Sequence, residues 1–180
     1  SATRHAIKVA KENGAILSFD PNIRESLWKD MEDAGAQMAY GLSICDILKI
    51  SDNEIQWFSR KEDYTEGIHM LQQTYQIPLI LLSMGKDGSR AYYKDMLVGV
   101  LAFLQKNTIE TTGAGDTFGA CRLHHILKYG LDNLAERQLK EMLRFANAAA
   151  SIITTRKGVL RVMPSVEKIQ NIKNYFERIS

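Results

Sequence analysis

The sequence IETTGAGDTFGACRLHHIL, from Ile109 to Leu127, places a turn of small residues directly before a helical pattern. Gly113, Ala114 and Gly115 let the backbone come close to a ligand, and apolar residues recur at helical spacing after them. The first N–H groups of a helix have no partner within it, and the helix dipole is positive there. The stretch therefore predicts a helix beginning at about Gly115, with an anion site at its N-terminus.

Asp116 follows this turn and lies in the first turn of the predicted helix. An acid beside a phosphate site is suited to take the proton from a hydroxyl that attacks a phosphoryl group. Two other interpretations of these residues stay open. Asp116 can serve only as a helix N-terminal acid. Gly113-x-Gly115, with Gly119 further on, also partly matches a dinucleotide-binding fingerprint, although the last glycine is one position late.

The composition is that of an ordinary globular protein and limits the classes of function. The chain has 180 residues, of which 45% are hydrophobic and 24% are charged, and its net charge is +2. This balance gives no reason to expect a nucleic acid or an anionic membrane as partner. No apolar run reaches membrane-spanning length, and no signal peptide opens the chain. The two cysteines lack metal-ligand company, so we expect free thiols in a reducing, cytoplasmic environment.

Strand and helix patterns along the chain predict an α/β protein with a mostly parallel sheet. The expected helices are Thr3–Asn13, Leu27–Leu42, Thr65–Tyr75, Gln138–Ile153 and Ser165–Ile179; the expected buried strands are Ala15–Phe19, Ile44–Ile50 and Leu79–Leu82; and a hairpin is expected from Arg90–Tyr93 and Leu97–Leu101. We find no internal repeat and no linker, and we expect a single domain over residues 1–180. The carboxyl ends of parallel strands form the edge at which open α/β sheets bind ligands.

Polar residues follow two of the predicted strands at this edge. Asn22 and Arg24 lie in the segment DPNIR after the first strand, while Lys49, Ser51 and Glu54 stand at the end of the second. The pattern Ser51-x-x-Glu54 is also that of an ordinary helix capping box, and DPNIR is also typical of a Pro-directed loop with a solvent-exposed Arg.

The stretch TTGAGDTFGA resembles the second signature of the PfkB (ribokinase-like) carbohydrate kinases, D-T-x-G-A-G-D. The resemblance implies that Asp116 is the catalytic base and contacts the substrate hydroxyl. It also implies that Gly113, Ala114 and Gly115 form the anion hole for the transferred phosphoryl group, with Gly115 on the nucleotide. Glu110 stands where the family has its first Asp, which helps to hold a monovalent cation in many members. The resemblance therefore leaves the use of K⁺ through Glu110 open.

Other polar segments resemble the same family. DPNIR is similar to the DPNxR segment of fructokinases and 2-keto-3-deoxygluconate kinases, which implies that Asn22 and Arg24 bind substrate. KISDNE resembles the N-x-x-E region, with Ser51 in place of Asn, and implies that Glu54 holds Mg²⁺ through water. The further nucleotide-binding residues that the resemblance implies are Lys49, Ser83, Gly85, Gly88 and Asn147. The Ser83–Gly88 turn is equally typical of a β-hairpin.

The resemblance implies a ribokinase-like fold, a three-layer α/β/α arrangement with a doubly wound sheet. It extends over all 180 residues but only over the later, nucleotide-binding part of the family fold. We therefore expect a sheet incomplete at its N-terminal side, and either a homo-oligomer or a missing N-terminal half. The implied activity is ATP- and Mg²⁺-dependent phosphorylation of a sugar, with fructose first and 2-keto-3-deoxygluconate second. A catalytically silent nucleotide-binding fragment and an NAD(P)-binding module stay open as alternatives.

Overall fold

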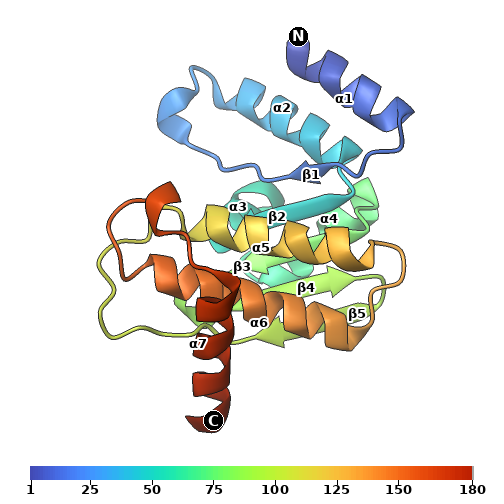
Figure 1. Cartoon of the computed structure of the whole chain (residues 1–180). Coiled ribbons are helices and arrows are strands. Elements are labelled where there is room, and N and C mark those ends of the chain that lie inside the picture. Colours follow the sequence, from blue (N-terminus) through green and yellow to red (C-terminus); the bar gives the residue numbers. More distant parts are fainter. Residues whose placement is uncertain (180) are drawn as a thin grey trace. The chain divides into compact units, whose positions relative to one another are not determined.

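The structure, a computed structural model, describes residues 1–179. Helices and strands alternate along the chain, as the sequence predicts for an α/β protein (Figure 1). The strands form one sheet in the order β1-β2-β3-β4-β5, and β1 pairs with β2 in parallel, with Ser18 opposite Ile47. The chain divides into two compact units. Residues 1–82 and 92–95 make up the first unit, and the second consists of residues 83–91 and the chain from residue 96 onward.

The elements follow the predicted order closely. The first unit contains α1 (Ala2–Glu12), β1 (Ser18–Phe19), η1 (Glu25–Leu27), α2 (Met31–Ile44), β2 (Ile47–Ser51), α3 (Asp52–Ser59), α4 (Tyr64–Tyr75) and nearly all of β3 (Leu79–Ser83). The second contains η2 (Gly85–Asp87), β5 (Met96–Val100), α5 (Ala114–Tyr129), α6 (Glu136–Ile153), η3 (Leu160–Val162) and α7 (Val166–Ile179), while β4 (Ser89–Tyr93) is shared between the two.

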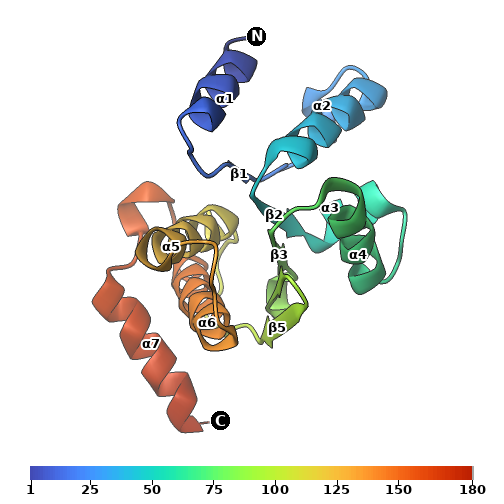
Figure 2. The same cartoon turned by 90° about the vertical axis from the view of Figure 1, so that its right-hand side faces the viewer.

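The core of the first unit is built on β2 and β3. Ile47, Leu48 and Ile50 of β2 are fully buried, as are Leu79–Leu82 of β3. Strands buried on both faces consist of continuous apolar runs, which is why the sequence predicts both of them correctly. Helix α3 packs on β2 and beside α4, and Figure 2 shows the two helices next to each other.

The core of the second unit is built around α6, which contacts β5, α5 and α7 (Figures 1 and 2). The alanine stripe of α6 is buried, as its spacing predicts, and lets the neighbouring helices approach closely. The apolar cluster against α7 consists of Phe103, Phe145, Ala148, Ala149, Ile152 and Ile169. The apolar spacing of the last helix predicts that Val166 faces this core, but Val166 is 64% exposed. A buried lysine, Lys173, lies on the inner face of α7 and pairs with Glu141 of α6.

The first strand differs from its prediction. We expected a buried strand over Ala15–Phe19, but only Ser18 and Phe19 pair with β2, and Ile16 is 49% exposed. The N–H of Leu17 donates to the side chain of Asp46 at 2.7 Å. In addition, β1 lies at one end of the strand order, so β2 is its one neighbour in the described sheet. The apolar run therefore predicts that a strand exists here, but not its length or how far its residues are buried.

The start of α2 also differs from its prediction. The apolar spacing suggests a helix over Leu27–Leu42, but α2 begins at Met31 because the side chain of Asp30 caps it and accepts the N–H of Glu32 at 2.9 Å. Leu27 lies in the preceding 3₁₀ turn and is 76% exposed. The helix continues to Ile44, so β2 begins at Ile47 and not at Ile44.

Both cysteines are free thiols, as the sequence predicts. Cys45 is buried and Cys121 is half-buried. Burial raises the pKa of Cys45 to about 12 and the pKa of Cys121 to about 11. Both thiols are therefore protonated at neutral pH, which makes them poor nucleophiles and poor metal ligands.

His124 and His125 lie on different faces of α5, as predicted. His124 is exposed, whereas His125 is buried, with its ring centroid 5.6 Å from that of Phe145 and 5.8 Å from that of Tyr129. Burial lowers the pKa of His125 from its ordinary value, against an opposing effect of the nearby Glu141 carboxylate. The folded protein therefore holds this imidazole in its neutral form more strongly than the unfolded chain does.

We expect the free energy of unfolding to decrease as the pH falls below about 6.5, the ordinary pKa of histidine. In that range the unfolded chain binds a proton at His125 that the folded protein resists, and the difference favours unfolding. Denaturant titrations at pH 7.5 and 5.5 should therefore show a smaller loss in His125→Phe than in the unchanged chain. His124→Gln is the matched control and should keep the full pH dependence, because His124 is exposed. Identical pH dependence in all three proteins would contradict this assignment.

Candidate functional site

The predicted glycine turn lies at the start of α5, as expected. Gly113 is the N-cap residue and has φ +79°, a left-handed conformation that favours glycine. A Cβ atom added to Gly113 would lie 2.5 Å from Cγ1 of Val159, so space also requires glycine here. The N–H of Ala114 donates to the carbonyl oxygen of Thr111 at 3.1 Å. The N–H of Thr117 donates to the carbonyl oxygen of Gly113 at 2.9 Å, so within the described first turn the N–H groups of Gly115 and Asp116 are the ones open to an anion.

Asp116 is exposed in the first turn of α5, while the next residues, Thr117 and Phe118, are buried. The segment after α6 holds this end of the helix. The N–H groups of Ile109 and Glu110 donate to the carbonyl oxygen of Thr154 at 2.8 and 3.3 Å. A carboxylate is thus presented to solvent beside open N–H groups, on a backbone that a second segment supports.

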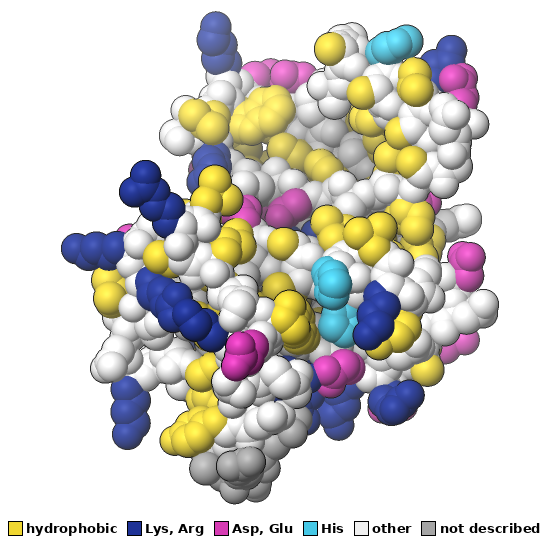
Figure 3. Space-filling view, viewed as in Figure 1, with side chains coloured by type: hydrophobic (Ala, Val, Ile, Leu, Met, Phe, Trp, Pro, Cys, Tyr) yellow, Lys and Arg dark blue, Asp and Glu magenta, His cyan; other side chains and the backbone are white. Residues whose placement is uncertain are grey.

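The same supporting segment carries positive charge. Arg156, Lys157 and Arg161 follow α6, and Figure 3 shows Lys and Arg side chains gathered at the left edge of this face, where the segments before α5 and after α6 run. Glu110 lies beside this segment, and its Oε1 accepts the N–H of Gly158 at 3.4 Å. Positive charge next to a helix N-terminus strengthens attraction of an anionic ligand.

The Ser83–Gly88 turn is held tightly by backbone contacts of the second unit. The N–H of Met84 donates to the carbonyl oxygen of Gly88 at 2.9 Å. Gly88 has φ +97°, and a Cβ atom added there would lie 2.1 Å from the carbonyl oxygen of Val100 at the end of β5. Gly85 has φ +52° with no atom within 4 Å of the position of a Cβ atom. Glycine is therefore required at position 88 because two backbones meet there. At position 85 only the left-handed backbone conformation favours glycine.

Asn147 of α6 is buried and ties together the elements around this turn. Its Oδ1 accepts the hydroxyl of Ser89 at 2.9 Å, and its Nδ2 donates to the carbonyl oxygens of Val100 and Leu101 at 3.3 and 3.1 Å. Both amide hydrogens are thus engaged by the end of β5. The carbonyl oxygen of the side chain keeps a lone pair for a further donor.

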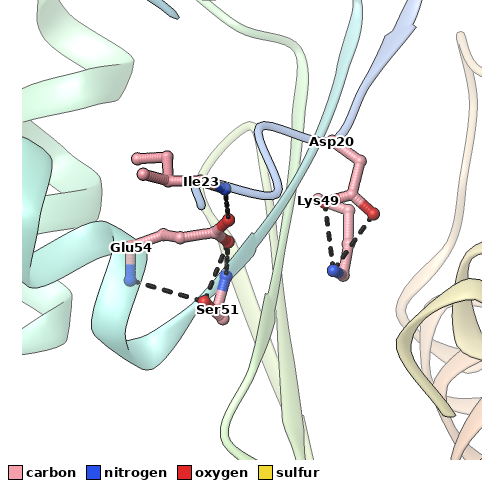
Figure 4. A network of polar contacts seen from close by, with 5 residues as sticks. All are labelled: Asp20, Ile23, Lys49, Ser51 and Glu54. Atoms are coloured by element: carbon pink, nitrogen blue, oxygen red, sulfur yellow. Dashed lines mark hydrogen bonds and ion pairs between the residues drawn. The ribbon is translucent and has the colours of Figure 1, made fainter. Parts of the chain in front are cut away.

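In the first unit, the capping box predicted at Ser51 and Glu54 is confirmed (Figure 4). Glu54 Oε2 accepts the N–H of Ser51 at 2.9 Å and its hydroxyl at 2.8 Å. The other oxygen, Oε1, accepts the N–H of Ile23 at 2.9 Å. No local pattern in the sequence indicates the contact between Glu54 and Ile23, because the two residues are 31 positions apart along the chain.

Lys49 lies on β2 beside this network and forms an ion pair with Asp20. Its Nζ is 3.1 Å from Oδ1 and 3.0 Å from Oδ2 of Asp20, and the Lys49 side chain is only 10% exposed (Figure 4). Asn22 and Arg24, the predicted substrate residues, are exposed on the same short segment as Asp20. The first unit therefore brings Asn22, Arg24, Lys49 and Glu54 into one neighbourhood. The other predicted site residues, which include Asp116, Ser83 and Asn147, belong to the second unit.

The described acidic side chains do not form a site that would ligate Mg²⁺ directly. Within residues 1–179, no group of three or more His, Cys, Asp or Glu side chains is arranged to hold a metal ion. Glu54 already accepts hydrogen bonds on both carboxylate oxygens. Mg²⁺ keeps several of its waters and is often bound through one or two carboxylates together with substrate phosphates. Glu54 therefore fits contact with Mg²⁺ through water better than direct ligation.

None of the described helices is long and apolar enough to cross a membrane.

Comparison with known proteins relates the whole chain to one family. Residues 1–166 match the profile described as pfkB family carbohydrate kinase. Probable fructokinase-2 of Arabidopsis thaliana is 37% identical over 165 residues, which cover 92% of this chain and 50% of that protein. Putative fructokinase-8 of the same plant is 35% identical over 179 residues, which cover 99% of this chain and 85% of that protein.

Solved structures share the fold. A fructokinase from Vibrio cholerae O395, in a form with fructose, ADP and calcium ion bound, has a TM-score of 0.86 and 28% identity, covering 94% of this chain and 54% of that one. A putative ribokinase II from E. coli, in complex with ATP and Mg²⁺, has a TM-score of 0.82, with 24% identity, and covers 97% of this chain and 54% of that one. These neighbours confirm the ribokinase-like α/β fold. The chain spans about half the length of both proteins.

Proposed function

This chain belongs to the pfkB family of carbohydrate kinases, and we propose that it takes part in ATP-dependent phosphoryl transfer to a sugar hydroxyl. The observation that carries the proposal is the start of α5, where exposed Asp116 stands beside open backbone N–H groups. Fructose is the proposed acceptor, because the curated relatives are fructokinases and the Vibrio cholerae enzyme contains fructose. Other members of the family phosphorylate other sugars, and 2-keto-3-deoxygluconate is the second candidate for the acceptor.

In the proposed reaction, Asp116 accepts the proton of the sugar hydroxyl as that oxygen forms a bond to the γ-phosphorus of ATP. The bond between the γ-phosphorus and the bridging oxygen breaks, and ADP leaves. The N–H groups of Gly115 and Asp116, which the Gly113–Asp116 turn presents, and the helix dipole would stabilise the charge on the transferred group, while Gly113 and Ala114 shape the turn. Phosphoryl transfer depends mainly on positioning and electrostatics, so a helix N-terminus and one base supply its main requirements.

Further roles are proposed for the remaining predicted residues. Asn22 and Arg24 would contact the sugar from their exposed positions in the first unit. Residues proposed to line the nucleotide are Lys49, Ser83, Gly85, Gly88, Gly115 and Asn147. Asn147 would do so through the oxygen of its amide and by holding the end of β5 in place.

Two cations enter the proposal. Mg²⁺ supplies charge neutralisation at the phosphates when bound, and Glu54 would hold it through water, as its hydrogen bonding suggests. For K⁺ the proposed ligand is Glu110. Its Oε1 accepts only a long hydrogen bond of 3.4 Å from Gly158, which a bound cation could replace. We also propose a reducing, cytoplasmic setting, in which Cys45 and Cys121 stay free thiols.

Calorimetric titration of the 180-residue chain with ATP·Mg²⁺ and, separately, with NADP⁺ tests the proposal. We expect binding of ATP·Mg²⁺ alone, together with ADP formation that depends on added fructose. Nucleotide binding without fructose-dependent ADP formation would favour the alternative of a silent nucleotide-binding protein. Binding of NADP⁺ in place of ATP would contradict the kinase assignment.

A further inference from the structure

Residues 20–24 form neither helix nor strand, yet they adopt a defined and unusual conformation. Asn22 has φ +46°, which is uncommon for a residue other than glycine. Pro21, beside it, is buried. A short segment without regular structure keeps such a conformation only when surrounding groups impose it. The groups that do so here come from β2 and from the start of α3 (Figure 4).

The first group is the ammonium of Lys49, which contacts both carboxylate oxygens of Asp20 at 3.0 and 3.1 Å. Lys49 is 8% exposed, so its charge is largely removed from water. A buried charge that loses its partner is strongly destabilising, which favours the conformation that keeps the pair intact. The ion pair therefore fixes the segment on one side of Asn22.

The second group is the carboxylate of Glu54, which fixes the segment on the other side. Its Oε1 accepts the N–H of Ile23 at 2.9 Å, while its Oε2 accepts the N–H of Ser51. Hydrogen bonds to a charged acceptor are roughly twice as strong as those between neutral groups. Because Glu54 is 9% exposed, water competes poorly for these bonds. One side chain thus joins the segment to the corner between β2 and α3.

We propose that Glu54 and Lys49 are positioning residues for Asn22 and Arg24, through their contacts with Ile23 and Asp20. This extends the role of Glu54 beyond the capping box and beyond contact with a metal. The contacts of Glu54 with Ile23 and of Lys49 with Asp20, together called the tether, do not depend on the kinase assignment. The effect of the tether on sugar binding rests on the proposed function, in which Asn22 and Arg24 contact the sugar.

Glu54→Gln separates these roles, because an amide has one acceptor oxygen where a carboxylate has two. Glutamine can accept the N–H of Ile23 or that of Ser51, but its NH₂ group then faces the other donor. Asp52→Asn is the matched control. Asp52 lies in the same first turn of α3, and its side chain accepts the N–H of Asn53; within the described residues it forms no hydrogen bond or ion pair with residues 20–24.

The experiment measures amide hydrogen exchange by NMR on the full chain, without nucleotide and with EDTA present. We expect slow exchange at Ile23 in the unchanged protein, although Ile23 lies outside helix and strand. Exchange at Ile23 should become about tenfold faster or more in Glu54→Gln, from loss of a partly buried hydrogen bond, and stay unchanged in Asp52→Asn. Amides in the core strand β3 report that the variant remains folded. If Glu54→Gln does not fold, Glu54→Asp replaces it, since the shorter carboxylate keeps its charge but cannot span both partners.

Glu54→Ala removes both acceptor oxygens, and unchanged exchange at Ile23 in a folded Glu54→Ala chain would overturn the proposal. Glu54 would then act only as a cap of α3 or only toward metal. A second measurement links the tether to the substrate. In Glu54→Gln the dissociation constant for fructose should increase about tenfold, while that for ATP in EDTA stays within about twofold. Absence of fructose binding in the unchanged chain would contradict the proposed function, and hydrogen exchange at Ile23 would still decide whether the tether exists.

Discussion

Replacement of Asp116 by Asn is expected to lower kcat for fructose phosphorylation by about 10²–10⁴-fold, the usual contribution of a general base. The amide has nearly the same shape as the carboxylate but cannot accept the hydroxyl proton at neutral pH. The open N–H groups at the start of α5 remain, so the dissociation constant for ATP·Mg²⁺ should change by no more than about threefold. Coupled measurement of ADP formation, together with calorimetry, provides both quantities.

Glu136→Gln is the matched control for this prediction. Glu136 is the first-turn acid of α6, and its N-cap Ala135 is not part of a glycine turn. Both substitutions remove a negative charge from a helix N-terminus, which costs about 0.3–1 kcal/mol of stability. Only Asp116→Asn should change the rate of phosphoryl transfer. Equal rates in the two variants would mean that Asp116 is simply a helix N-terminal acid, which is the alternative that its sequence position leaves open.

The largest effect on stability is expected from Gly88→Ala, which should lower the free energy of unfolding by about 3–5 kcal/mol. Gly88 has φ +97°, and the new Cβ atom would lie 2.1 Å from the carbonyl oxygen of Val100 and 2.8 Å from Cα of Leu101. These are backbone atoms, so no flexible side chain can move aside. Separation of the two backbones would also disturb the hydrogen bonds from Asn147 to Val100 and Leu101.

Thermal denaturation measures this loss. A chain of this length loses about 2–4 °C in Tm for each kcal/mol, so Gly88→Ala should lower Tm by about 10 °C. Gly85→Ala is the matched control from the same turn. It has φ +52° with open space around the Cβ position, so backbone strain alone should cost about 1–2 kcal/mol. Similar losses of Tm in the two variants would show that the crowding at Gly88 is relieved more easily than the structure indicates.

Features that depend on neighbouring residues along the chain could be predicted from the sequence. The start of α5 after Gly113, its end at Gly130 and the capping box of Ser51 and Glu54 are all confirmed. Each arises from backbone groups and side chains a few residues apart, which a local pattern records. The start of α2 belongs to the same class. Its N-cap Asp30 directly precedes Met31, whereas apolar spacing alone predicts a helix that begins at Leu27.

The burial of residues along α7 shows what apolar periodicity cannot predict. Helical spacing predicted an inward Val166, yet Val166 is exposed and Lys173 is buried against Glu141. Which residues of a helix face the core depends on the helix it meets and on where the two cross. Neither is encoded in the spacing of apolar residues alone.

The amino-acid sequence is sufficient to predict the order of elements, the two buried strands and the small-residue turn before Asp116, because these depend on local bonding and on apolar periodicity. Which distant groups meet depends on how the whole chain folds. The N–H of Ile23 reaches Glu54 across 31 positions, and Asn147 reaches the carbonyl oxygen of Leu101 across 46. Such contacts depend on the register and packing of whole elements, which satisfy buried polar groups with partners from remote segments. The residues proposed to carry chemistry are thus visible in the sequence, whereas the groups that hold them in position are not.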